Sequence, residues 1–138
     1  MRFETDGQIV LARFIAREDH IGFKHTIHGG IVATVLDEIM VWACAVKTRR
    51  FGYCAELNVR FSSPMRPGSE VFASSELVND RRGKIFEAKA ELRDAKGVLL
   101  ASGTGKYLPI KESELPALLA DFKEDASQWF NPLAGAVR

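Results

Sequence analysis

Hydrophobic and polar residues follow two periods along this chain, and the longest apolar run predicts a helix. Residues 31–47, IVATVLDEIMVWACAVK, contain 13 apolar residues in 17. A helix that is apolar nearly all round is normally buried, so this run predicts a core helix. The run is short for a membrane span and is interrupted by Asp37 and Glu38, so we do not expect it to cross a membrane.

Alternation of apolar and polar residues predicts strands on both sides of this helix. Residues 8–18 form the first predicted strand, and residues 19–29, which hold three histidines and two glycines, have the composition of a loop. A short helix is predicted near the C-terminus, with Pro116 in its first turn. The strands predicted after the long helix are residues 53–61, 69–78, 85–93 and 98–108, and the short helix is residues 113–123. This order is typical of an α+β fold in which an antiparallel sheet wraps around a single helix.

Composition narrows the range of functions. A chain of 138 residues with 46% hydrophobic and 27% charged residues is expected to form one domain spanning residues 1–138, with a peripheral tail from about residue 111. The net charge of +1 gives no field that would attract nucleic acid or a membrane surface. The first residues do not resemble a secretory signal, and Cys44 and Cys54 have no metal-like spacing, so a reduced, cytoplasmic location is expected.

The two carboxylates inside the apolar helix need an explanation, because burying a charge without partners is costly. Asp37 lies seven residues after Gly30 and shares its helix face, about 10 Å further along the axis. Free N–H groups at the helix N-terminus suit an oxyanion, yet a carboxylate 10 Å away cannot reach the same small group. Two helices packed antiparallel about a two-fold axis would bring each Asp37 to the 28–30 loop of the partner. The spacing therefore predicts a homodimer with two sites and an inactive monomer.

A structural role for both carboxylates is the alternative. Asp37 and Glu38 would then pair with Lys or Arg, or would mark the one wet edge of the helix. Glu38 fits this role better, because it does not share the face of Gly30.

Three motifs give the chain a family resemblance. HGGIVATVLDE at residues 28–38, AELNVRF-x-x-P at residues 55–64 and G-x-E-V at residues 68–71 resemble the hotdog-fold thioesterases, specifically the PaaI-like acyl-CoA thioesterase branch. The similarity runs from about residue 23 to residue 107. It implies a hotdog fold, an antiparallel five- or six-stranded sheet around one long central helix, in homodimers that often pair into tetramers. It also implies hydrolysis of an acyl-CoA thioester to the free acid and CoA, with no metal or other cofactor.

The resemblance also assigns roles to residues. It makes Asp37 the catalytic carboxylate, as general base or as nucleophile, and Gly29 the N–H donor that polarises the thioester oxygen. His28 would hold the loop and contact the carbonyl group or water. Arginine and lysine side chains suit the phosphates of CoA. The residues expected to bind substrate are Gly30, Glu38, Cys54, Asn58, Arg66, Arg81, Arg82 and Lys84.

Two positions depart from the family pattern and leave alternatives open. Gly22 stands where some members carry an Asn, and Cys54 stands where a Ser or Thr is common. Both departures favour an alternative, a non-catalytic protein that binds or senses acyl-CoA. Another alternative is a hotdog dehydratase acting on hydroxyacyl thioesters.

Other possible sites are weaker. The spacing of His20, His25 and His28 does not favour a metal site. Cys44 is expected to be an inert buried thiol.

Overall fold

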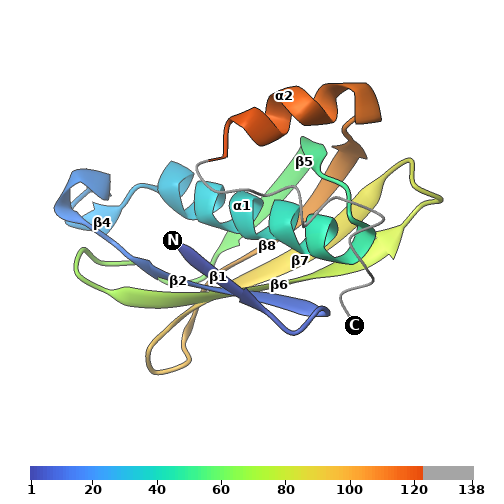
Figure 1. Cartoon of the computed structure of the whole chain (residues 1–138). Helices are drawn as coiled ribbons and strands as arrows, with labels where there is room; N and C mark the ends of the chain where they lie inside the picture. Colours follow the sequence, from blue (N-terminus) through green and yellow to red (C-terminus); the bar gives the residue numbers. More distant parts are fainter. Residues whose placement is uncertain (123–138) are drawn as a thin grey trace.

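The computed structural model describes residues 1–122, which form one six-stranded antiparallel sheet with a long helix across one face (Figure 1). The order of strands in the sheet is β1-β2-β6-β7-β8-β5, so β1 and β5 are its edges. This arrangement confirms the predicted α+β class and the sheet wrapped around one helix. The strands are β1 (Arg2–Thr5), β2 (Ile9–Ile15), β5 (Gly52–Phe61), β6 (Glu70–Asp80), β7 (Phe86–Asp94) and β8 (Leu99–Pro109).

The long helix, α1 (Gly29–Thr48), is the predicted apolar run extended by two residues at its start and one at its end. His28 is its N-cap residue, and Arg49 ends it in the left-handed conformation with φ 61°. By length and composition α1 is apolar enough to cross a membrane, a test that the core helix of a globular protein also passes. Here its apolar face packs on the sheet, with these residues buried: Val32, Val35, Leu36, Ile39, Met40, Ala43, Cys44 and Ala45.

Strand β5 follows the predicted alternation, with one irregularity near its start. Leu57 and Val59 face the helix and are half-buried, whereas Glu56, Asn58 and Arg60 are exposed. The pairing with β8 shifts by one residue between Cys54 and Glu56, so Ala55 is an extra residue in a β-bulge. The bulge allows Cys54 to share the inner face with Leu57, although three positions separate them.

The segment expected to be a loop contains short elements of its own. A 3₁₀ turn over Glu18–His20 leads into a two-stranded ribbon of β3 (Ile21–Phe23) and β4 (Thr26–Ile27). The Ile27 N–H donates to Met65 O at 2.8 Å, which ties the ribbon to the segment after β5. Strands of two and three residues are too short to show a period, and β1, at four residues, was missed for the same reason.

The other face of α1, near its C-terminal half, carries a second apolar cluster. A 3₁₀ turn over Glu112–Glu114 precedes α2 (Leu115–Ala120), which is shorter than predicted and has Pro116 in its first turn. Leucines of α2 pack with the buried side chains of Ala45, Phe51 and Ile110. Residue 123 of the predicted helix, and the tail from residue 124, lie outside the described residues.

Candidate active site

The loop that opens α1 leaves one backbone N–H available. The Gly30 N–H donates to His28 Nδ1 at 2.9 Å, and the Ile31 N–H donates to His28 O at 2.9 Å. Among residues 1–122, no acceptor lies against the Gly29 N–H. Gly29 is thus the free donor, whereas the N–H of Gly30 is already used. Because Nδ1 of His28 accepts a hydrogen bond, its ring proton is on Nε2 in this arrangement.

Close packing fixes this loop in place. A Cβ at Gly29 would lie 3.2 Å from Cζ of Phe61, whose ring covers the glycine. A Cβ at Gly22 would lie 2.9 Å from His28 Cα and 3.0 Å from His28 Cβ. A hydrogen bond also anchors the backbone of His28, because its N–H donates to His20 O at 2.9 Å. Position 22 therefore has no room for the Asn that the family resemblance associates with it, because His28 occupies the space.

Asp37 lies two turns into α1 and is half-buried between the helix and the sheet. Its Oδ1 accepts a hydrogen bond of 2.8 Å from the hydroxyl of Tyr107 on β8. Cys54, paired with Tyr107 across the β5–β8 ladder, faces the same carboxylate beside the bulge. Partial burial of the thiol, followed by the negative charge of Asp37, raises the pKa of Cys54. Sequence reasoning missed Tyr107, because 70 residues separate it from Asp37 and no local pattern joins them.

Within one chain, Asp37 and the free N–H of Gly29 do not meet. Eight residues of helix separate them, which is about 12 Å along the axis. The exposed residues Gly30, Thr34 and Glu38 form a stripe along this part of α1. Strand β5 lies at the sheet edge and pairs only with β8 within residues 1–122.

A hollow of about 390 Å³ adjoins Gly29 at the start of the helix. Most of its lining is apolar, and Asp37 is not part of it. The main lining residues are Ile27, Gly29, Val32, Phe61, Met65 and Leu100.

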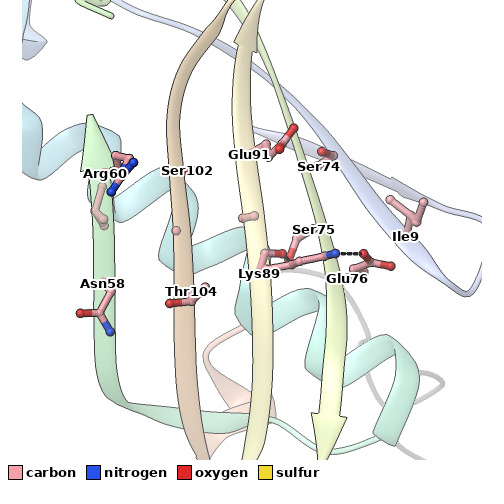
Figure 2. Close-up of a pocket in the computed structure, with 13 residues that line it drawn as sticks. Ile9, Asn58, Arg60, Ser74, Ser75, Glu76, Lys89, Glu91, Ser102 and Thr104 are labelled. Atoms are coloured by element: carbon pink, nitrogen blue, oxygen red, sulfur yellow. Dashed lines mark hydrogen bonds and ion pairs between the residues drawn. The ribbon is translucent and has the colours of Figure 1, made fainter. Parts of the chain in front are cut away.

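A second hollow of about 710 Å³ opens on the outer face of the sheet, with the helix behind it (Figure 2). Most of the residues that line it are polar or charged, and two of them, Lys89 and Glu76, form an ion pair of 2.7 Å. Asn58 lies here, where it donates to Glu56 Oε1 at 3.1 Å. The sheet separates Asn58 from Asp37, so the structure does not bring this expected substrate-binding residue to the carboxylate of its own chain.

The basic residues expected to bind phosphate lie in two separate regions. Arg66, on the β5–β6 loop, donates to Lys24 O at 3.4 Å near the start of α1. Arg81, Arg82 and Lys84 lie on the β6–β7 hairpin, where Arg81 pairs with Glu87 at 2.6 Å. The 11 residues of β6 place about 33 Å between the two regions. One chain therefore does not gather these side chains around a single ligand.

Two further expectations concern Glu38 and the histidines. Glu38 is exposed and accepts a hydrogen bond of 3.1 Å from Trp42 Nε1, which agrees with a structural role. His20 is stacked on Phe14, with the ring centroids 5.5 Å apart. Within residues 1–122, no three His, Cys, Asp or Glu side chains are grouped so that they could hold a metal ion.

Comparisons with known proteins cover the segment that contains this site. A family model described as the Thioesterase superfamily matches residues 24–101. Human acyl-coenzyme A thioesterase 13 is 25% identical over 95 residues, which is 68% of each protein. The structure of Escherichia coli PaaI, from the phenylacetic acid degradation operon, superposes with a TM-score of 0.71 at 14% identity, covering 76% of this chain and 79% of that one. A Streptococcus mutans protein solved with acetyl-CoA bound gives 0.73 at 13% identity, covering 80% and 90%.

Proposed function

This chain belongs to the thioesterase superfamily and has its hotdog fold, and from that premise we propose that it hydrolyses an acyl-CoA thioester to the free acid and CoA. One observation carries the proposal: the matched segment contains both a half-buried carboxylate, at Asp37, and a backbone N–H without an acceptor, at Gly29. The human relative named as an acyl-CoA thioesterase, and the fold neighbour solved with acetyl-CoA, support CoA thioesters as the substrate class.

We place each site between two copies of the chain. Strand β5 has ten residues and an unpaired edge within the described part of the chain, and long exposed edges are normally covered by a partner. Pairing β5 with its own copy would extend the sheet and set two α1 helices side by side in opposite directions. Asp37 of one copy would then approach Gly29 of the other, which removes the separation of about 12 Å within a chain.

The side chains of β5 favour one register for this pairing. Directly opposed residues of antiparallel strands point to the same face of the sheet. A two-fold axis at Asn58 therefore places each β5 residue that faces α1 opposite a residue of the other copy that also faces α1. Each Glu56 would then lie opposite Arg60 of the other copy, and Arg60 has no carboxylate partner among residues 1–122. Opposite charges in such positions stabilise a sheet. Because Ala55 is an extra residue, the same register sets Cys54 against Phe61 of the other copy, which brings the surroundings of Asp37 to those of Gly29.

The reaction needs only groups of this chain and water. The Gly29 N–H would polarise the thioester carbonyl and stabilise the oxyanion that forms, a contribution of about 3 kcal/mol for one well-placed amide. Asp37 of the other copy would take a proton from the attacking water, and the C–S bond would break as CoA leaves and receives that proton. His28 would offer its Nε2–H to the carbonyl group or the water. A thioester is already reactive, so the proposal requires no metal or redox group.

The surroundings suggest how the substrate would lie. The apolar hollow beside Gly29 would hold the acyl group or the thiol-bearing arm of CoA. Arg66, at the same end of α1, would take a phosphate, and the 81–84 hairpin of the second copy would supply further positive charge because the two-fold axis reverses the ends of the sheet.

Thiol release from a panel of acyl-CoAs tests the function, with wild type and Asp37→Asn measured together. Asn keeps the shape of the side chain but removes the base, so we expect kcat to fall about 100-fold to 10,000-fold with little change in KM. Asp6→Asn is the matched control, because Asp6 only accepts hydrogen bonds from Gln8 and Ile9 in a distant turn, a role that Asn keeps. If wild type binds acyl-CoA but releases no thiol from any member of the panel, the protein is a binding protein and the proposal is wrong.

A further inference from the structure

Tyr107 lies beneath Asp37 in a position that no recognised motif of the chain predicts. Its side chain is fully buried, yet its hydroxyl reaches the candidate site and donates to Asp37 Oδ1 at 2.8 Å. The same hydroxyl lies 3.4 Å from the backbone oxygen of Asp37. A buried phenol hydroxyl without a partner is costly, so this contact fixes the phenol and the carboxylate relative to each other.

Two glycines make the space for the Tyr107 ring. A Cβ at Gly105, two residues earlier on β8, would lie 2.6 Å from Tyr107 Cε2 and 2.7 Å from its hydroxyl oxygen. A Cβ at Gly52, on the paired strand β5, would lie 2.8 Å from Tyr107 Cβ. The ring therefore lies over one glycine and beside another, and from there its hydroxyl reaches Asp37. The sheet forms a specific cradle for this side chain.

We propose that Tyr107 is a positioning residue that holds Oδ1 of Asp37, so that Oδ2 is the oxygen presented to the reacting water. This inference rests on the proposed hydrolase function and deepens it. A carboxylate fixed at one oxygen loses the rotation about its own axis that would otherwise have to be restricted in each turnover. Tyr107 acts through Asp37 and does not touch the substrate.

The chemistry of the pair suits this role. Burial, followed by the hydrogen bond to Asp37, raises the pKa of Tyr107 well above its usual range. The phenol therefore keeps its proton, and remains a donor, wherever the carboxylate is ionised. Among residues 1–122, the other titratable group that faces Asp37 is Cys54 on β5. Its pKa is raised as well, so it stays neutral and is a weaker donor.

Tyr107→Phe is the direct test, since it removes the hydroxyl and keeps the ring in its cradle. We expect kcat to fall about tenfold, the loss for one hydrogen bond to a charged group, with KM within about twofold of wild type. Tyr53→Phe makes the same change at the chain's other tyrosine, which is 57% exposed on the outer side of β5, and should match wild type.

The outcomes separate this inference from the proposed function. A wild type that releases thiol, with Tyr107→Phe showing the same kcat and KM, overturns the positioning role alone. A lower melting temperature with unchanged kcat and KM also overturns it, because Tyr107 would then be only structural.

A spectroscopic readout does not depend on turnover. In a Tyr53→Phe background Tyr107 is the only tyrosine, so the tyrosine doublet in the Raman spectrum reports its hydrogen bond alone. We expect a strong donor signature that weakens when Asp37→Asn is added. An unchanged doublet overturns the inference, even in a protein that releases no thiol.

Discussion

The contact between Gly22 and His28 allows a test in which family resemblance and structure predict opposite results. The resemblance implies an Asn at this position in some family members, so Gly22→Asn installs a residue that the resemblance associates with the reacting groups. The structure predicts a loss. A Cβ at position 22 would lie 2.9 Å from His28 Cα and 3.0 Å from both Cβ and Cδ2 of the same residue.

The size of the loss follows from these distances. Unstrained carbon contacts are about 3.5–4.0 Å long, so one side must move by roughly 0.6–1 Å. The closest atom belongs to the backbone of His28 and cannot rotate away, and overpacking of this kind costs about 1–3 kcal/mol. The next backbone group is the Gly29 N–H. A displacement of about 1 Å at that donor is enough to reduce turnover by roughly 100-fold.

Gly22→Asn and Gly22→Ala should be measured together, by thiol release and by thermal unfolding. Alanine brings the same Cβ without the amide, so both variants should lose about 10-fold to 100-fold in kcat. Their melting temperatures should fall by roughly 3–15 °C. If Gly22→Asn equals or exceeds wild type in kcat, and Gly22→Ala unfolds at the wild-type temperature, the contact does not fix the loop and the reasoning about Gly29 is wrong.

Two further predictions concern the β5 edge and the cysteines. With Asn58 at the two-fold axis, Asn58→Cys should form a disulfide-linked dimer on mild oxidation, because directly opposed residues have Cα atoms about 4.5–5.5 Å apart. Glu56→Cys is the control, because it is also exposed on β5 but should not form the disulfide. Equal yields of disulfide from the two variants would refute the register. Burial raises the pKa of Cys44 to about 12, so in a thiol assay at pH 8 the folded protein should show no more than one reactive group, that of Cys54, and the unfolded protein two. Two reactive groups before unfolding would contradict the burial of Cys44.

Much of the fold was predictable because its strongest signals are local. The apolar run at residues 31–47 and the alternation in the strands after it each reflect one face that must be buried. The same alternation already set Asn58 on the face opposite to Leu57, and the structure agrees. Asn58, which the resemblance implies as a substrate-binding residue, therefore lies on the face of the sheet opposite to Asp37.

The parts of the site that were not predicted depend on contacts between distant segments. Tyr107 and Asp37 are brought together by strand order, and no spacing in the sequence encodes that order. The sequence showed Gly22 only as a departure from the family pattern. Its role, leaving space for His28, is visible only once the β3–β4 ribbon lies against His28. The basic residues raised the converse problem, since side chains that look alike in sequence lie at opposite ends of β6.

The bulge at Ala55 leads to a deletion that should be tolerated. Cys54 pairs with Tyr107 and Glu56 with Lys106, so removing Ala55 leaves a regular strand in which every other residue keeps its face. Deleting Asn58 instead slips the rest of β5 by one residue and turns its inner side chains outward. We expect the protein lacking Ala55 to unfold within a few degrees of wild type, and the protein lacking Asn58 to be strongly destabilised or unfolded.

The activity should respond differently from the stability. Bulges change the direction of neighbouring side chains, so removing Ala55 should alter the orientation of Cys54 and of the β5 edge beside Asp37, and kcat should fall. Equal destabilisation by the two deletions would show that the bulge is part of the fold itself, and wild-type kcat without Ala55 would show that it has no part in the site.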